Sequence, residues 1–146
     1  KSDYYSFLSS MSAAAVMNWA LTVRGERIAD MQRVAREFNE LRPYYMEDYY
    51  PLTGIQDLTS DKVWLAYQLN SKSDNSGIVV AFRRPECDTS TCDVALKGLE
   101  RESIYEVCNV IEGSEYKLRG DELMKTITLQ SAEPRGAVLL KYRKVE

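Results

Sequence analysis

The stretch VWLAYQLNSKSDNSGIVVAF, residues 63–82, decides the fold class of this chain. In its first part Val63, Leu65, Tyr67 and Leu69 alternate with a second set at residues 64, 66 and 68. A period of two is typical of a β-strand. A polar run at residues 72–77 favours a turn, and a second apolar run follows it up to residue 82. The stretch therefore predicts short strands joined by a tight turn.

Further runs of this kind continue toward the C-terminus. Turn-forming residues such as Glu133–Gly136 separate short apolar runs at residues 94–96, 104–110, 126–129 and 137–142. Several short strands joined by tight turns are typical of an antiparallel sandwich. We therefore expect residues 51–146 to form an antiparallel β-sandwich.

The first part of the chain has a helical period instead. Between Ile28 and Arg42 the apolar positions are 28, 31, 34, 35, 38 and 41, which predicts an amphipathic helix, and Pro43 ends it. The segment Ser9–Leu21 also favours a helix, capped by serine. We expect a helical segment over residues 1–50, and an α+β chain as a whole.

Composition excludes several chemistries. The 146 residues are 45% hydrophobic and 28% charged, with a net charge of -3 and no histidine. Without imidazole there is no Ser-His-Asp relay and no HExxH zinc site, so catalysis would rest on carboxylates, lysine, tyrosine or thiols. We expect no cofactor and no metal ion.

Charge and hydropathy also restrict the partners. The 19 basic residues are scattered among 22 acidic ones, so we expect no nucleic-acid partner. The longest apolar stretch, residues 13–21, is too short to cross a bilayer of roughly 30 Å.

Because the chain starts with Lys1 and shows no signal peptide, we expect an excised piece of a longer protein, with its compartment undecided.

The three cysteines leave two interpretations open. Cys87 and Cys92 flank a short polar run and could form a disulfide across a turn. Alternatively all three thiols are reduced, and Cys108 serves as a small hydrophobic residue on a strand.

The most unusual segment is YYMEDYYPLTG, residues 44–54. It could be a sugar platform, because aromatic faces pack on pyranose rings while carboxylates bind hydroxyl groups. The favoured interpretation is a seam between two packed domains. We do not expect catalysis by Glu47 and Asp48, because sequence neighbours rarely face each other across a substrate. The candidate carbohydrate or interface contacts are Tyr44, Tyr45, Asp48, Tyr49, Tyr50 and Trp64.

Three other residues have two interpretations each. Trp64 could stack on a ligand, with Tyr67 beside it on the same strand, but a core or seam position is favoured for this tryptophan. Arg83 and Arg84 could clamp an anion, although solvated charges at a strand end are favoured.

The order of these motifs resembles the C-terminal end of the family 36 glycoside hydrolases, the retaining α-galactosidases. The similar pieces are YYMEDYYPLTG at 44–54, VWLAYQL at 63–69, GIVVAFRRP at 77–85, LKGLERESIYEV at 96–107, GDELM at 120–124 and RGAVLLKY at 135–142. The resemblance implies that residues 28–42 are the last helix of a (β/α)₈ barrel, and that a C-terminal β-sandwich packs against this barrel.

The resemblance also implies that this chain has a structural role and no catalytic residues of its own. Both catalytic aspartates of such a glycosidase would lie upstream of Lys1, so no catalytic residue is carried over. The chain would stabilise the upstream barrel of a hydrolase of carbohydrate metabolism that cleaves terminal α-galactosides. Oligosaccharide and a second copy of the chain are further candidate partners. The alternatives are a carbohydrate-binding module and a protein-interaction domain.

Overall fold

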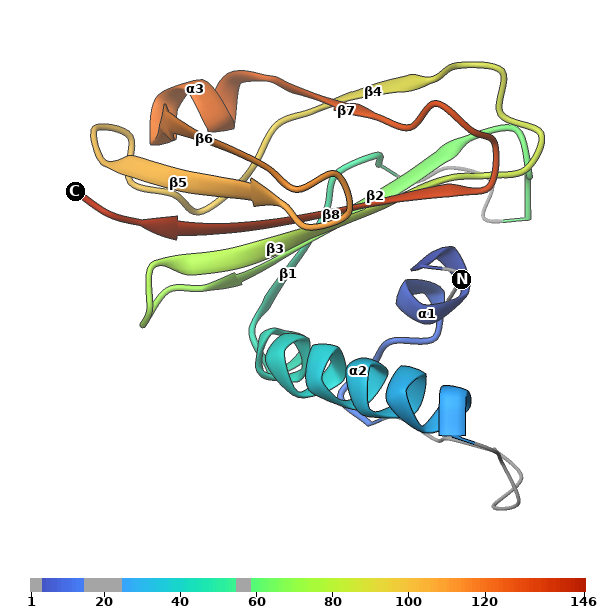
Figure 1. Ribbon diagram of the computed structural model, residues 1–146. Helices are drawn as coiled ribbons and strands as arrows, with labels where there is room; N and C mark the ends of the chain where they lie inside the picture. The colour runs from blue at the N-terminus through green and yellow to red at the C-terminus, as the bar shows by residue number, and fades with distance from the viewer. Residues whose placement is uncertain (1–3, 15–24, 55–58) are drawn as a thin grey trace.

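The computed structural model describes residues 4–14, 25–54 and 59–146. The helices are α1 (Tyr4–Ser9), α2 (Gly25–Leu41), the 3₁₀ helix η1 (Arg42–Met46) and α3 (Gly120–Lys125). Figure 1 shows α1 and α2 on one side of the β-structure and α3 on the other. None of the helices in the described ranges is long and apolar enough to cross a membrane.

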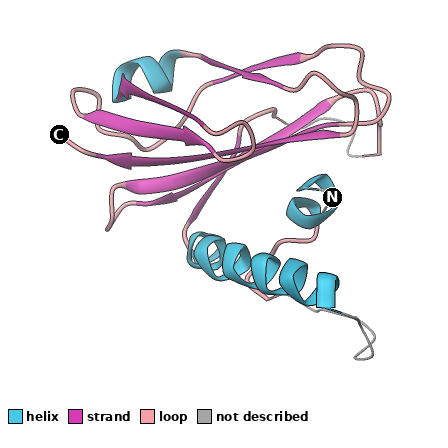
Figure 2. Cartoon of the chain, viewed as in Figure 1, coloured by secondary structure: helices cyan, strands magenta, loops and turns pink. Residues whose placement is uncertain are grey.

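The strands form two sheets. The six-stranded sheet has the order β1-β2-β3-β8-β5-β6, and the two-stranded sheet pairs β4 with β7. All pairings are antiparallel. The bounds are β1 (Asp48–Pro51), β2 (Trp64–Ser71), β3 (Ser76–Arg83), β4 (Thr91–Val94), β5 (Ile104–Asn109), β6 (Ser114–Arg119), β7 (Ile127–Gln130) and β8 (Gly136–Lys144). The predicted antiparallel sandwich in an α+β chain is confirmed, as Figure 2 shows.

The central strand β3 explains why its sequence is apolar without interruption. All eight of its residues are buried. Val79 and Ala81 belong to the core between the two sheets, whereas Ile78, Val80 and Phe82 belong to a second cluster with α1 and η1. A strand covered on both faces needs apolar side chains at successive positions rather than at alternate ones. The large sheet is therefore the middle layer of the molecule.

A buried polar network ties β2 to β8. The Gln68 amide donates to the Tyr142 hydroxyl at 2.7 Å and to the Lys97 carbonyl at 2.8 Å. The Tyr142 hydroxyl in turn donates to Asn70 Oδ1 at 2.7 Å. Burial raises the pKa of Tyr142 above its ordinary value. Satisfied networks of this kind fix the register of strands, because any slip leaves a polar group unpaired in the core.

This network predicts a loss of stability in alkaline solution. An unfolded tyrosine ionises near pH 10, whereas buried Tyr142 stays protonated. Its contribution is therefore fully present below about pH 10 and is lost as pH rises further, with a slope of at most about 1.4 kcal/mol per pH unit. Urea unfolding at pH 9 and pH 11 should show a shallower pH dependence for Tyr142→Phe than for the wild type. An equal pH dependence in the two proteins would show that ionisation of Tyr142 does not cause the loss of stability.

Arg83 is not the solvated charge that the sequence favoured. Only 7% of the residue is exposed. Its guanidinium donates to the Cys87 carbonyl at 3.0 and 2.9 Å, and to the Ser131 and Ala132 carbonyls at 3.0 and 2.8 Å. Arg83 therefore joins the loop before β4 to the loop after β7. Cys87 and Cys92 flank part of this loop region, and all three cysteines are free thiols.

The remaining expectations for the elements have mixed outcomes. The amphipathic helix is confirmed as α2. The helix expected from Ser9 is wrong over residues 10–14, which form turns and bends, and residues 15–21 lie outside the described part. The sequence did not predict β1, β6 or α3, and it placed β4 three residues too late. The division between residues 1–50 and 51–146 stays a prediction, and β1 pairs with β2 across that position.

Candidate functional site

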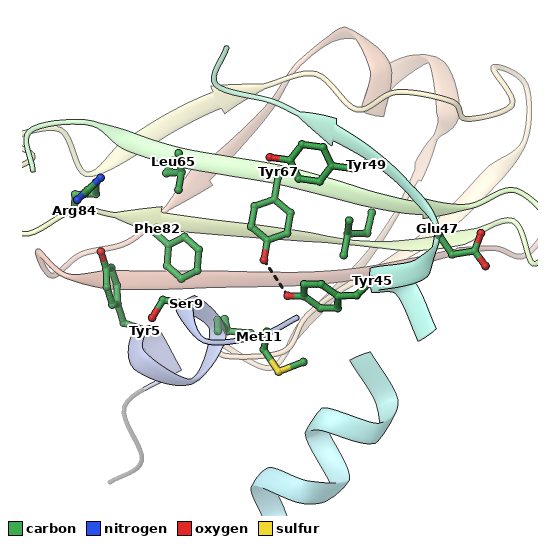
Figure 3. Close-up of a pocket in the computed structure, with 12 residues that line it drawn as sticks. Tyr5, Ser9, Met11, Tyr45, Glu47, Tyr49, Leu65, Tyr67, Phe82 and Arg84 are labelled. Carbon is green, nitrogen blue, oxygen red and sulfur yellow. Dashed lines mark hydrogen bonds between the residues drawn. The ribbon is translucent and has the colours of Figure 1, made fainter. Parts of the chain in front are cut away.

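A pocket of about 550 Å³ lies between α1, η1 and the face of β2 and β3 (Figure 3). Its aromatic lining is Tyr5 of α1, Tyr45 of η1, Tyr49 of β1 and Tyr67 of β2, together with Phe82. We call it the tyrosine pocket. The other lining residues are apolar (Leu8, Met11, Leu65, Leu69) or polar (Ser9, Glu47, Arg84).

Strand register brings two of these tyrosines together. Tyr49 pairs with Leu69, which makes Tyr67 its diagonal neighbour on the adjacent strand. Diagonal neighbours lie within reach when the side chains are aromatic. The two ring centroids are 5.6 Å apart, with an angle of 32° between the planes. Since Tyr49 is 60% exposed, part of this aromatic surface is open to solvent.

Tyr67 also forms a second pair in the pocket lining, with Tyr45 of η1. The hydroxyls of Tyr45 and Tyr67 lie 2.9 Å apart and share a hydrogen bond, which Figure 3 marks. Burial raises the pKa of both residues, and for Tyr67 the neighbouring Tyr45 raises it further. Both phenols therefore stay protonated near neutral pH, so either can donate the shared proton.

The other sequence candidates lie outside the pocket lining. The Tyr44 hydroxyl is 3.2 Å from Ser76 Oγ. Asp48 forms an ion pair with Lys72 at 2.7 Å, which lowers the Asp48 pKa, and it accepts a hydrogen bond from Tyr50 at 3.3 Å. Trp64 is 5% exposed in the core of the sandwich and donates to the Thr89 carbonyl at 2.9 Å. Of the six candidate residues, Tyr45 and Tyr49 therefore line the pocket and the other four do not.

Sequence reasoning missed part of the lining. Tyr5 comes from α1, about forty positions before the tyrosine-rich segment, and no local motif links the two. Arg84 was interpreted as a solvated charge or as an anion clamp, and the structure pairs its guanidinium with Asp61 at 2.8 Å in the pocket lining. A signal for Tyr67 did exist, since the alternation of β2 puts it on the opposite face from Trp64.

The arrangement does not support carboxylate chemistry at Glu47 and Asp48. Glu47 lines the pocket, whereas Asp48 is paired with Lys72 outside the lining. Glycoside hydrolysis needs two carboxyl groups on either side of one scissile bond.

Within the described residues, no three side chains of Cys, Asp or Glu gather closely enough to hold a metal ion.

The fold is similar to that of solved glycoside hydrolases. The GH36 α-galactosidase AgaB from Geobacillus stearothermophilus matches with a TM-score of 0.65 and 19% identity, over 85% of this chain and 16% of that one. A variant of AgaA from the same organism, solved in complex with raffinose, gives 0.64 and 19% over 85% and 17%. The α-galactosidase from Lactobacillus brevis gives 0.59 and 16% over 86% and 17%.

These matches concern one part of much longer enzymes. The chain spans about one sixth of the length of the solved structures it matches, at 16–17% coverage. No family model and no curated protein matches the sequence. At identities below 20% the likeness establishes the fold. The 146-residue chain thus shares its fold with one segment of the GH36 α-galactosidases, the family that its sequence motifs resemble.

Proposed function

We propose that this chain is the non-catalytic C-terminal segment of a retaining α-galactosidase-like glycoside hydrolase, and that it stabilises the catalytic barrel by packing against it. The observation that carries the proposal is the apolar side of α2, which packs against few apolar side chains among the residues that the structure describes. The solved relatives, of which it spans about 17%, supply the reason to expect a large partner domain.

Within the described ranges, helix α2 contacts the rest of the chain mainly at its C-terminal end. At its C-terminus Leu41 is buried in the cluster with α1 and the sheet. Earlier in the helix Ile28 is 48% exposed, and Val34 and Phe38 are only partly buried. Of the described residues, the two core clusters and the side chains packed on them do not include Ile28, Val34 or Phe38. Figure 1 shows α2 below the β-structure, with its end next to β1 and its start farther from the sheet.

This geometry is typical of a helix that continues a layer formed by other elements. An amphipathic helix gains most of its stability from burying its apolar side. In the proposed parent, the neighbouring elements of a (β/α)₈ barrel would cover that side, and their strands would carry the two carboxylates of a retaining mechanism. The parent would hydrolyse terminal α-galactosides, whereas the 146-residue chain alone would not.

The test compares this chain with the longer polypeptide encoded by its reading frame. We expect the longer polypeptide to hydrolyse an aryl α-galactoside and the chain alone to show no turnover. Val34→Asp should destabilise the longer polypeptide by about 3 kcal/mol, because it places a charge in an apolar contact. The same change should cost the isolated chain less than about 1 kcal/mol, since partly exposed sites tolerate substitution.

The matched control is Asn39→Asp, which adds the same charge at an exposed position of α2. It should leave both polypeptides within about 0.5 kcal/mol of the wild type. Turnover by the 146-residue chain alone, or a reading frame without an upstream barrel, would overturn the proposal.

A further inference from the structure

Two of the three cysteines lie in the core of the sandwich. Cys87 is 4% exposed and belongs to the core cluster between the two sheets, and the partly buried Cys92 packs against the same cluster. In β4, Cys92 lies on the same face as the buried Val94, because side chains two positions apart along a strand share a face. Both thiols therefore point into one core, from the two ends of a loop formed by residues 88–91.

The backbone around the two cysteines is fixed by hydrogen bonds. The Cys87 carbonyl accepts two of them from the Arg83 guanidinium, at 3.0 and 2.9 Å. The Thr89 carbonyl, in the middle of the loop, accepts one from the Trp64 indole at 2.9 Å. Cys92 itself lies in β4, which pairs with β7 along its whole length. The fold thus restricts the positions of both sulfur atoms.

The Cys87 thiol makes weak contacts that a reaction can replace. It donates to the Thr89 carbonyl at 3.7 Å, and its sulfur lies 3.4 Å from Thr89 Oγ1. Thiols are weak hydrogen-bond donors. Burial raises the pKa of Cys92, and the neighbouring Asp93 and Cys87 raise it further. Cys87 is thus close enough to act on Cys92, and the less buried Cys92 is the thiol that a reagent in solution reaches first.

We propose that Cys87 and Cys92 form a reversible modification site for glutathione disulfide, and that the fold favours an internal disulfide between them. In the first step the Cys92 thiol loses its proton, and its sulfur attacks one sulfur of the reagent. The reagent's S–S bond breaks, and one glutathione leaves as a thiolate that takes up a proton.

In the second step the Cys87 thiol loses its proton, and its sulfur attacks Cys92 Sγ. This attack displaces the second glutathione, which also takes up a proton. Two cysteine thiols are oxidised, and one glutathione disulfide is reduced to two thiols. The product joins the start of the loop covalently to β4. The inference is independent of the barrel contact, because no described residue of α2 belongs to this core cluster.

The test treats the folded chain with glutathione disulfide, blocks the remaining thiols with N-ethylmaleimide and maps tryptic peptides by mass spectrometry. Cys87 and Cys92 share the peptide 84–97, because Pro85 prevents cleavage after Arg84, whereas Cys108 lies in the peptide 102–117. We expect the peptide 84–97 to lose two hydrogen atoms and to carry no glutathione. Glutathione that stays on this peptide, or a peptide 84–97 that is unmodified when Cys108 has reacted, would overturn the proposal.

A comparison of folded and unfolded chains separates the effect of the fold from closeness in sequence. The ratio of disulfide to dithiol at known glutathione concentrations gives the effective concentration of one cysteine toward the other. We expect this value to be about tenfold higher or more in buffer than in urea, and the unfolding equilibrium constant of the oxidised chain to fall by the same factor. An equal or lower value in the folded chain would contradict the proposal.

Single variants test the order of the two steps. Cys87→Ala should keep glutathione on Cys92, because the thiol that displaces it is absent. In folded Cys92→Ala, the buried Cys87 should stay unmodified while Cys108 reacts. The matched control is Cys108→Ser, which should form the internal disulfide as the wild type does. Modification of Cys87 in Cys92→Ala as fast as that of Cys108 would show that the reagent reaches Cys87 directly, and would overturn the proposed order.

Discussion

The Arg83→Met variant is expected to lose a large part of the folding stability of the chain. Methionine keeps the buried apolar stem but removes the donors that satisfy the carbonyls of Cys87, Ser131 and Ala132. Each buried acceptor left without a partner costs about 1–3 kcal/mol, so the total is about 4 kcal/mol or more. Natural domains have about 5–15 kcal/mol of stability in all.

Urea unfolding followed by tryptophan fluorescence measures this loss. Trp64 is a suitable probe because its indole donates to Thr89, in the loop whose carbonyls Arg83 binds. The matched control is Arg143→Met, since the Arg143 side chain is 71% exposed in its ion pair with Glu106. That variant should cost less than about 1 kcal/mol. Equal midpoints for the two variants would show that Arg83 has no special structural role.

Gly77→Ala is expected to have the second largest effect. A β-carbon at this position would lie 2.1 Å from the Tyr142 hydroxyl oxygen and 2.5 Å from the Leu69 carbonyl oxygen. Both distances are well inside van der Waals contact, so the Tyr142 ring must move and release Gln68 and Asn70. Overpacking of a core costs about 1–3 kcal/mol, and the broken network places this variant at the upper end.

Thermal unfolding of single and double variants tests the cause. Tyr142→Leu removes the phenol atoms that the new methyl group would meet, although the Leu69 carbonyl stays, so Gly77→Ala with Tyr142→Leu should be less destabilising than the sum of the two changes. Ser73→Ala, in the exposed turn between β2 and β3, is the control and should be nearly neutral. Additive effects of Gly77→Ala and Tyr142→Leu would locate the strain elsewhere.

The parts of the fold that the sequence predicted are those whose burial is periodic. Strand β3 and helix α2 each carry enough apolar residues for their period to be read locally. Strand β6 gave no signal, because nearly all of its residues are exposed at the edge of the sheet. Strand β1 is four residues long and ends at Pro51, so its existence depends on pairing with β2.

The candidate site was predictable in composition but not in geometry. The tyrosine-rich segment was identified, yet only Tyr45 and Tyr49 of its four tyrosines line the pocket. In β2 each set of alternating side chains begins with apolar residues, so the sequence could not tell that Tyr67 lies on the pocket face and Trp64 in the sandwich. That assignment depends on which layer covers each face, which is a property of the whole chain.

The position of β8 has a consequence for synthesis on the ribosome. This strand, Gly136–Lys144, is the last of the sheet to be translated, yet it lies between β3 and β5 in the middle. Until residue 144 has left the exit tunnel, both neighbours therefore lack their shared partner. Sheets with such distant pairings also form slowly. We expect nascent chains that stop before β8 to remain unfolded and to be degraded, which makes the synthesis of β8 the step that allows the sheet to fold.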